Sequence, residues 1–521
     1  MSALSQLYSL IISDIWTTII SLLIGYVVYY LAKFYYQYYS LPPGPFPLPL
    51  IGNLLTFRSR HHWDYIMRKL AKKYGPIFTV YLGNSPQIMI TDPVIARKAF
   101  NKSDFSGKTQ TYFVKLMGDG VIMADYGPNW ETRRNVAHAA VKKYSNNERL
   151  VNVVVDCVDN TVETMLKTIG PNKPIEPSDY IYLTFLNILA NSAFNEKYSI
   201  DDPEFKKFKF VLKDLFYELA QLISFCEYSK LIQWIYYKYL KKILKHFDEI
   251  REIIIEKLKI HYKDYDQNIE RDFCDTLIAA KNNALREGVG QGVGVSKQSV
   301  AKYLTDDKLG MTVFDMFFAG IDTSYNTFQW MLLFLANDLN VQKKLRNEIS
   351  DKIGDRLPTL DDRQRCHYSM AFISETLRFR NVVPVGVEHK AIVDSKIGNY
   401  MIPKNMSVYV YQGFILRNDS NKYLTTNPND FIPERFIDSD NHYMTPTSGS
   451  QPDFIPFGVG RRVCIGEKMA IADLFLVLIR FLQSTQTYDI VLDSHQGFDA
   501  DPNNSDSISP SSYTIMFKSK S

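Results

Sequence analysis

The chain has 521 residues, of which 46% are hydrophobic and 22% are charged. These fractions are typical of folded globular proteins and exclude a disordered or collagen-like chain. The formal net charge of +4 is small for this length, so nucleic acid is not an expected partner. By length alone, the chain would divide into about three or four domains.

An uncharged apolar run, Ile15 to Ala32, lies near the N-terminus. As a helix it would extend about 27 Å, close to the thickness of one hydrocarbon core. No Lys or Arg precedes it and Lys33 follows at once, a bias that places the bulk of the chain in the cytoplasm. Tyrosines typical of a membrane interface gather at its end: Tyr26, Tyr29, Tyr30, Tyr35, Tyr36, Tyr38 and Tyr39. We predict a single-pass anchor over residues 1–33; a cleaved signal peptide and a buried N-terminal helix are the alternatives.

A proline-rich segment, which begins at Leu41 with the sequence LPPGP, follows the predicted anchor. Proline fixes its own φ and restricts the residue before it, so residues 34–51 are predicted to form a stiff, extended hinge. Beyond the hinge no linker or repeat divides the chain. The glycine-dense stretch 288–294 follows a helix-like segment rather than a strand, which favours an inter-helix loop over a dinucleotide-binding loop. Residues 52–521 are therefore predicted to form one domain.

Helical patterns dominate this domain. Asp248 to Tyr262 and Asp272 to Leu285 are both predicted helices that open on an aspartate suited to an N-cap. Asp306 to Leu339 is long and rich in apolar residues, so it is predicted to cross the middle of the core. Short strand-like runs at 77–82, 87–91 and 408–411 predict small sheets. The predicted fold class is mainly α with small peripheral β-sheets (α+β).

The five cysteines include no C-x-x-C pair, which argues against a disulfide framework or a zinc site. Cys464 differs from the others because it lies in the segment DFIPFGVGRRVCIG, just before an apolar helix. A helix N-terminus stabilises a thiolate through its free N–H groups and its dipole. Gly458 and Gly460 allow tight backbone geometry there. A soft anionic sulfur on a rigid loop is the ligand that haem-thiolate iron requires.

Five residues of this segment match the haem-cysteine signature F-x-x-G-x-R-x-C-x-G, and through them the chain resembles the cytochrome P-450 family: Phe457, Gly460, Arg462, Cys464 and Gly466. Other segments resemble motifs of that family in the family's order. They are W-x-x-x-R at Trp130 and Arg134, the oxygen-activation motif at 319–324, E-x-x-R at Glu375 and Arg378, and the following arginine motif at Arg435. The resemblance covers most of the chain.

The resemblance implies a role for each of these groups. Cys464 is expected to be the axial ligand of the iron of haem b, and Asp322 with Thr323 an acid–alcohol pair that delivers protons to bound oxygen. Local widening of the helix at Gly320 is expected to make room for dioxygen. The haem propionates need cationic and N–H donors, for which the candidates are Trp130, Arg134, His389 and Arg462. Glu375, Arg378 and Arg435 are expected to form a structural network behind the cysteine loop.

The chain is therefore predicted to be a membrane-anchored monooxygenase of the endoplasmic reticulum that inserts one oxygen atom from O2 into a lipophilic small molecule. Electrons from NADPH are expected to come from a separate flavoprotein reductase, with a small b-type cytochrome as a further partner. The reductase is expected to dock on the basic cysteine side, at Arg461, Arg462 and Lys468. The alternatives are a haem-thiolate isomerase or dehydratase and a non-catalytic haem-binding sensor.

The segment Lys230 to Phe247 mixes lysines with Trp234 and several tyrosines. Such a basic amphipathic helix favours a membrane surface, and packing against the protein's own core is the alternative. By resemblance this segment and residues 105–123 border the substrate channel. A channel that opens near lipid fits a lipophilic substrate.

Overall fold

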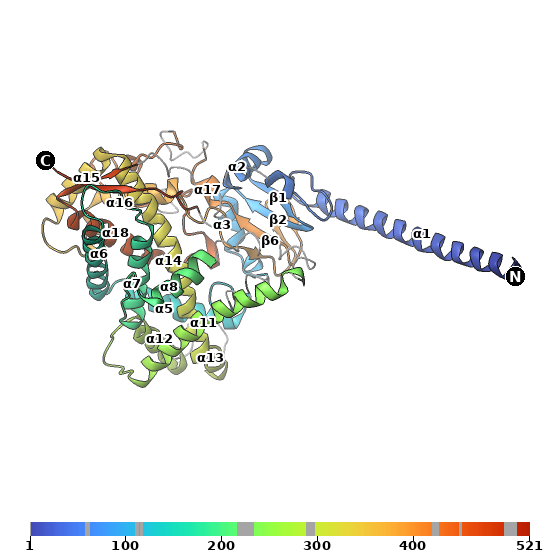
Figure 1. Ribbon diagram of the computed structural model, residues 1–521, viewed down its shortest axis with the longest axis horizontal. Helices are drawn as coiled ribbons and strands as arrows, with labels where there is room; N and C mark the ends of the chain where they lie inside the picture. The colour runs from blue at the N-terminus through green and yellow to red at the C-terminus, as the bar shows by residue number, and fades with distance from the viewer. Residues whose placement is uncertain are drawn as a thin grey trace.

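The computed structural model describes residues 2–57, 63–109, 114, 118–215, 234–287, 297–418, 427–446, 451–493 and 508–520, with side chains from residue 15 onward. Figure 1 shows a large helical body, a smaller sheet-containing region beside it, and one long helix, α1, that projects away from both. The predicted fold class is confirmed, since the described residues are mainly helical with small sheets. Within them the helical body and the sheet region have their own buried apolar clusters.

The α-helices follow one another along the chain with few long interruptions. Their bounds are α1 Ser2–Ser40, α2 Trp63–Tyr74, α3 Pro93–Phe100, α5 Pro128–Tyr144, α6 Glu148–Thr168, α7 Ser178–Phe194, α8 Pro203–Lys209, α11 Tyr237–Lys263, α12 Phe273–Glu287, α13 Lys297–Tyr303, α14 Asp306–Asn337, α15 Leu339–Lys352, α16 His367–Phe379, α17 Gln412–Ile415 and α18 Glu467–Ser484. A π-helical turn, η3 Phe210–Leu215, continues α8. Short 3-10 turns are η1 Leu54–Phe57, η2 Ser103–Phe105, η4 Leu360–Gln364, η5 Pro433–Phe436 and η6 Gly460–Arg462.

In the part of the chain that the structure describes, the strands form three small sheets. The largest has the order β1-β2-β6-β3, formed by β1 Ile77–Leu82, β2 Ser85–Ile90, β6 Ser407–Val410 and β3 His389–Lys390. Strand β2 pairs antiparallel with β1 and parallel with β6, in the register Ile88↔Val408. Two hairpins complete the set, from β4 Ser395–Ile397 with β5 Tyr400–Ile402 and from β7 Tyr488–Leu492 with β8 Ile515–Ser519. All three predicted strand-like runs are confirmed, and they lie in the same sheet.

The predicted helices differ from the observed ones at their starts. Asp272 precedes α12 and its carboxylate accepts a hydrogen bond from Asp275 N at 3.0 Å, which confirms the predicted N-cap. Asp248 does not cap a helix, because α11 begins earlier, at Tyr237. The apolar stripe of α11 includes Leu240 and Phe247, and it extends the helix past the aspartate.

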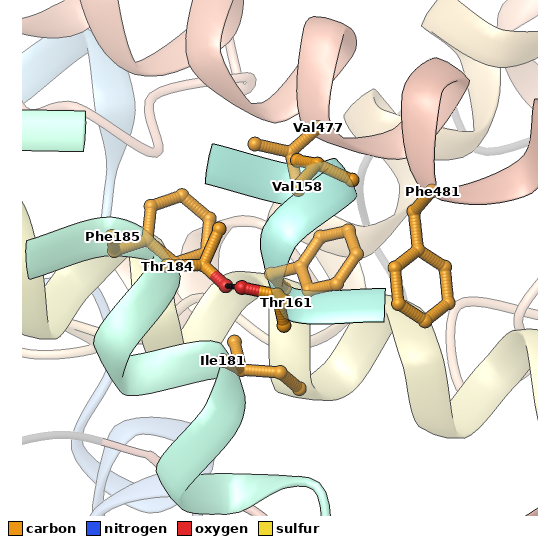
Figure 2. Close-up of a pocket in the computed structure, with 8 residues that line it drawn as sticks. Val158, Thr161, Ile181, Thr184, Phe185, Val477 and Phe481 are labelled. Atoms are coloured by element: carbon orange, nitrogen blue, oxygen red, sulfur yellow. Dashed lines mark hydrogen bonds between the residues drawn. The ribbon is translucent and has the colours of Figure 1, made fainter. Parts of the chain in front are cut away.

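Helix α14 runs through the centre of the helical body, as its apolar composition predicts (Figure 1). Most of its side chains from Leu309 onward are buried, and α7 packs along it. A void of about 10 Å³ lies where α14 meets α6, α7 and α18 (Figure 2). Its lining is apolar apart from Thr161 and Thr184, whose hydroxyls bond each other at 2.7 Å. This volume has room for about one water molecule, so the void is too small to be a substrate site.

Helix α1 does not end at residue 33 but continues to Ser40, into the segment predicted as hinge. Its last turns pack on the sheet region: Phe34 is 6% exposed and its ring lies 5.4 Å from that of Tyr81 on β1. The prolines after it are also held, since Thr79 donates from Oγ1 to Pro42 O at 2.8 Å and from N to Pro43 O at 2.9 Å. The proline segment is thus a packed edge of the sheet region and not a free connector.

The N-terminal end of α11 has one face that packs on the core and one that is exposed, as the two interpretations of the basic segment would each require. Residues 230–233 of that segment lie outside the described part. Leu240 and Phe247 pack into the core, whereas Trp234 is 75% exposed. Ile235, Tyr236, Tyr237 and Tyr239 are exposed beside it. The predicted loop 288–294 and much of residues 110–117 also lie outside the described residues.

Candidate haem-thiolate site

The cysteine loop is a tight turn that ends just before α18. Cys464 N donates to Phe457 O at 3.0 Å, which closes the loop on itself. Gly460 has a φ of 80°, and a Cβ on it would lie 2.3 Å from Phe100 O. Only glycine fits this position, because both the backbone conformation and the close approach exclude a side chain. The sequence prediction of a rigid loop at a helix N-terminus agrees with this geometry.

The thiol of Cys464 is the accessible one among the described cysteines. Cys157, Cys274 and Cys366 are buried, whereas Cys464 is exposed. The protein around Cys464 raises the pKa of its thiol by desolvation, while the N–H groups of Gly466 and Glu467 and the charge of Arg134 favour the thiolate. A bound metal cation deprotonates a coordinating thiol outright. The loop therefore offers a thiol whose anionic form a bound metal cation would stabilise.

Four basic side chains gather at the cysteine loop, and three of them come from segments distant in sequence. Arg134 on α5 donates to Val463 O, next to the cysteine. Arg462 donates to Ser106 O at 2.8 Å and to Ala124 O at 2.8 Å. His389 is 7% exposed and Lys108 is 3% exposed. The structure thus brings together the predicted residues Arg134, His389, Arg462 and Cys464 and adds Lys108.

The charges in this cluster repel one another. Burial, together with the charges of Arg462 and Arg134, lowers the pKa of Lys108 to about 7 against the opposing effect of Glu388. Burial and the charge of Arg134 lower the pKa of Arg462 to about 9. Burial is the larger cause of both shifts, so negative charge placed beside these groups would stabilise their cationic forms. Two carboxylates, such as the propionates of a haem, would supply that charge beside an accessible thiol, so the donor set fits the group.

His389 is buried, which excludes a surface histidine. Its ring stacks on Phe100 at 3.7 Å, and Nδ1 lies 2.8 Å from Phe105 O. A carbonyl oxygen only accepts, so Nδ1 carries the proton and Nε2 is an acceptor in the neutral ring. Burial and the charge of Lys108 lower the pKa of His389 well below its ordinary value. His389 can therefore donate to a carboxylate from Nε2 only as the cation.

The Nε1–H of Trp130 is not free to be the predicted donor to the haem propionates. Its Nε1–H donates to Val121 O at 3.0 Å and is not directed to a ligand. Its ring faces the guanidinium of Arg462 at 3.9 Å and that of Arg134 at 5.6 Å. Cation–π contacts of this kind hold guanidinium groups in place. Trp130 thus orients the two arginines instead of offering a donor of its own.

Lys108 is the residue that sequence reasoning missed. It belongs to no motif, and the sole signal was its place in the stretch 105–123 that was expected to border the channel. Its Nζ donates to Glu388 O, one residue before His389. Arg462 was also expected on the docking surface, but its hydrogen bonds to Ser106 O and Ala124 O direct it inward. On the predicted docking surface Arg461 and Lys468 are exposed.

Asp322 and Thr323 lie side by side in α14, both partly buried. Thr323 Oγ1 donates to Ala319 O at 2.6 Å, the local bond expected of a helical threonine. Asp322 accepts a hydrogen bond from Asn326 Nδ2 at 3.1 Å. The widening predicted at Gly320 is absent, because α14 is an uninterrupted α-helix there. A Cβ on Gly320 would lie 3.0 Å from Leu189, so glycine instead allows α7 to pack closely.

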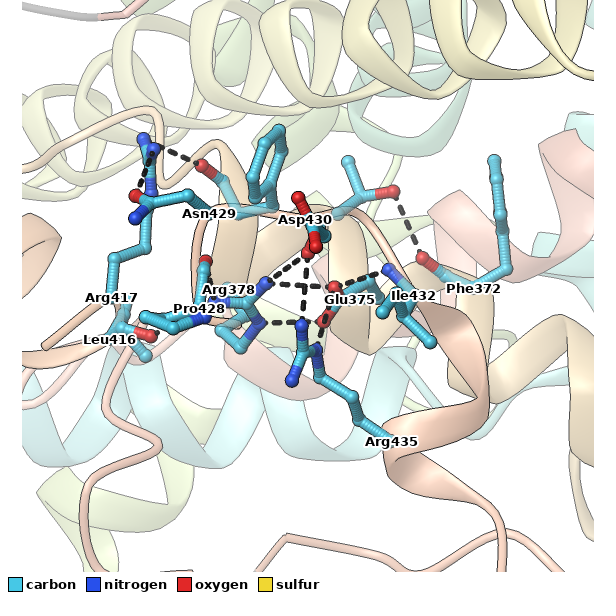
Figure 3. Close-up of polar contacts among 12 residues, drawn as sticks. Phe372, Glu375, Arg378, Leu416, Arg417, Pro428, Asn429, Asp430, Ile432 and Arg435 are labelled. Carbon is cyan, nitrogen blue, oxygen red and sulfur yellow. Dashed lines mark hydrogen bonds and ion pairs between the residues drawn. The ribbon is translucent and has the colours of Figure 1, made fainter. Parts of the chain in front are cut away.

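The predicted structural network is present and buried (Figure 3). Glu375 accepts from Arg378 Nε at 2.6 Å and Nη2 at 2.8 Å, and from Ile432 N at 2.7 Å. Arg435 Nε reaches the same carboxylate at 3.4 Å. Both guanidinium groups also donate to Asp430 O. The three residues thus join α16 to η5 and the segment before it.

A mainly helical fold with an accessible thiol on a glycine-bounded loop, beside a buried cation cluster, defines a haem-thiolate protein. Comparison with known proteins agrees, since residues 42–502 match the Cytochrome P450 family. The chain is 30% identical over 454 residues to Cytochrome P450 2E1 of Oryctolagus cuniculus, which covers 85% of this chain and 87% of that protein. It is 30% identical over 444 residues to Steroid 17-alpha-hydroxylase/17,20 lyase of Oryzias latipes, with 84% of each chain covered. The protein belongs to the cytochrome P450 family and is a haem-thiolate monooxygenase.

Proposed function

We propose that this protein inserts one oxygen atom from O2 into a lipophilic small molecule, using NADPH-derived electrons from a separate flavoprotein reductase. Cys464 would be the axial ligand of haem b, with Arg134, Arg462, Lys108 and His389 on the propionates, whose charge would favour the cationic form of His389. The observation that carries the proposal is the exposed Cys464 beside a cluster of buried and half-buried basic side chains, in which Arg134 bonds the residue next to the cysteine. Bound haem would supply the activation of dioxygen. A small b-type cytochrome is a second electron donor on this proposal.

The side chains of α14 would handle the proton. The Asp322 carboxyl is held by Asn326, and the Thr323 hydroxyl is held by Ala319 O. A hydroxyl that donates to a backbone carbonyl can accept a proton on one side and pass its own on rotation. The pair would thus hold a proton close to the site and transfer it from Asp322 to Thr323. This function for the pair favours a monooxygenase over an isomerase, a dehydratase or a haem sensor, none of which needs protons delivered to oxygen.

The absorption spectrum of the reduced, carbon-monoxide-bound protein tests the ligand. The wild-type chain should show the red-shifted band of thiolate ligation, and Cys464→Ala should lose it. Cys157→Ala is the matched control, because that cysteine is buried in the helical core and should keep the band. A red-shifted band that survives in Cys464→Ala would refute the assignment of the ligand.

Thr323→Ala tests the proton-transfer role. We expect NADPH consumption to continue while the product formed per NADPH falls about tenfold or more and peroxide rises. Thr327→Ala is the control, because its Oγ1 makes the same kind of bond one turn further on, to Thr323 O at 2.8 Å. Equal coupling in Thr323→Ala and the wild type would contradict the role.

The first helix would anchor the protein in the endoplasmic reticulum, with the catalytic domain in the cytoplasm. Among the described residues, Ile15–Ser40 is the one segment long and apolar enough to cross a membrane. The exposed side chains of Trp234, Ile235 and Tyr237 would add contact with lipid, which fits a lipophilic substrate. Protease treatment of sealed vesicles should digest the catalytic domain from the outside. Full protection of the domain would reverse the proposed topology.

A further inference from the structure

A buried carboxylate on α14 touches neither the cysteine loop nor the oxygen pair, and no motif contains it. Asp315 is 3% exposed, and its Oδ2 accepts a hydrogen bond from Ile122 N at 2.8 Å. Among the described residues its Oδ1 has no hydrogen-bond partner. Burying a carboxylate with one oxygen unpartnered costs free energy. The position of Asp315 therefore calls for a function, and its hydrogen bond to Ile122 N indicates where to look.

The carboxylate of Asp315 and the backbone of the 118–126 loop lie in close contact. A Cβ on Gly120 would lie 2.2 Å from Asp315 Oδ2, so any side chain there would push the carboxylate away. Glycine at this position lets the 118–126 loop lie directly against α14. The loop is held to α14 a second time, because Lys308 pairs with Asp119. The fixed position of the loop relative to α14 thus depends on a glycine and two aspartates.

The same loop provides backbone acceptors for Trp130 and for Arg462 of the cation cluster. Trp130 Nε1 donates to Val121 O at 3.0 Å, and Arg462 donates to Ala124 O at 2.8 Å. A longer bond, at 3.4 Å, joins Arg462 to Ile122 O. The N–H of Ile122 thus bonds Asp315, and the carbonyl of the same residue bonds Arg462. Movement of this backbone would therefore move the arginine and the indole that orients it.

We propose that Asp315 is a positioning residue that fixes the 118–126 loop and, through it, holds Trp130 in the place from which its ring orients Arg462 toward the propionates of bound haem. The proposal rests on the proposed function of the cation cluster. Asp315 would contact neither haem nor substrate. It acts through the Ile122 peptide, and its loss should loosen the hold on haem without removing any of the cations.

The electrostatic surroundings of Asp315 determine which substitution preserves the contact. Burial raises the pKa of Asp315 to about 7, although hydrogen bonds from the backbone and the charges of Arg133 and Arg251 lower it. The contact itself is the hydrogen bond from Ile122 N to the carboxyl oxygen. An amide oxygen in Asp315→Asn can accept the same hydrogen bond from Ile122 N, whereas Asp315→Ala removes it.

The rate of haem transfer from the holoprotein to apomyoglobin tests the proposal. Asp315→Ala should release haem about tenfold faster than the wild type, the fold-change expected when one buried hydrogen bond of about 1.4 kcal/mol is lost. Asp315→Asn should stay within about twofold to threefold of the wild type. Asp362→Ala is the control for general loss of stability, because Asp362 is buried and paired with Arg356 far from the 118–126 loop in sequence. It should lower the melting temperature without the same effect on haem release.

Hydrogen exchange at the Ile122 amide gives a readout that does not depend on activity. Its protection should fall in Asp315→Ala and persist in Asp315→Asn. If Asp315→Ala does not accumulate, Gly120→Ala should reproduce its fast haem release, because the new Cβ displaces the carboxylate. Equal haem release in Asp315→Ala, Gly120→Ala and Asp362→Ala at matched melting temperature would overturn the positioning role. Absence of the thiolate band in the wild type would instead overturn the proposed function.

Discussion

Removal of the Glu375 carboxylate should destabilise the protein far more than removal of a neighbouring exposed carboxylate. Glu375 is fully buried, and the side chains of Arg378 and Arg435 are 2% and 3% exposed. In Glu375→Ala both guanidinium groups remain buried without their counter-ion (Figure 3). Breaking a buried ion pair on one side costs about 3–5 kcal/mol. This is a large part of the roughly 5–15 kcal/mol by which a typical protein is stable.

Two features of the network determine how much of the unfolding free energy is lost within the range of about 3–5 kcal/mol. Arg378 also donates to Pro428 O at 2.9 Å and to Asp430 O at 3.1 Å, so its guanidinium keeps backbone acceptors and the loss should fall toward about 3 kcal/mol. Glu375→Gln keeps one oxygen for Ile432 N and should lose less, about 1.5–3 kcal/mol, as for a hydrogen bond to a charged group. The order of stability should be wild type, Gln, then Ala.

Urea unfolding of the holoprotein, followed by circular dichroism and by haem absorbance, measures these differences. Glu434→Ala is the matched control, because Glu434 belongs to the same 3-10 turn as Arg435 but its side chain is 45% exposed where it pairs with Lys344. An exposed pair contributes about 0–1 kcal/mol. Glu375→Ala should also accumulate with little haem, since the network supports the segment that leads to the cysteine loop. If Glu375→Ala is no less stable than Glu434→Ala, the buried-pair reasoning is wrong.

Two other contacts make separate predictions for stability. Asp272 accepts a hydrogen bond from His261 at 2.6 Å and thereby raises the pKa of His261 above its ordinary value of 6.5. Stability from this pair is present below pH 6.5 and is lost as the pH rises through the folded-state pKa, so His261→Gln should flatten that part of the pH dependence of urea unfolding. Phe34→Ala should cost about 3 kcal/mol or more, whereas Tyr36→Ala, whose side chain is 79% exposed, should change the unfolding free energy by less than about 0.5 kcal/mol.

The sequence predicts those parts of the fold that depend on local pattern. Apolar periodicity is sufficient for α14, and β-propensity is sufficient for the strands at 77–82 and 408–411. The residues at which helices start are harder to predict, because an aspartate caps a helix only where the apolar stripe begins. Asp272 stands at that point and Asp248 lies inside a longer stripe. The end of α1 was misplaced for a similar reason, since Phe34 continues the helix by packing on the sheet.

The candidate site was predicted as far as its residues form motifs. Cys464, Arg134 and the Glu375 network were expected from the family motifs that they resemble. In the structure Arg134 bonds Val463 O beside Cys464, and Glu375 pairs with Arg378. The directions of the side chains could not be read, because they depend on contacts between segments far apart in the chain. Arg462 turns inward because carbonyls of residues 106 and 124 accept its N–H groups. Lys108 is invisible to sequence reasoning for the same reason, as only the fold places it beside Glu388.

The largest sheet connects α1 to the cation cluster. At one edge, β1 carries Tyr81, on which Phe34 of α1 packs; at the other, β3 carries His389 and Lys390. Lys390 donates to Asp125 of the 118–126 loop at 2.7 Å, so the last strand of the sheet contacts the loop that holds Arg462. Because strands in a sheet move together, the packing at the base of α1 fixes the orientation of the cation cluster relative to α1. A substitution at Phe34 should therefore change the angle between anchor and haem site, which polarised absorption of haem in oriented bilayers would detect. An unchanged angle in Phe34→Ala would show that the proline segment alone sets this orientation.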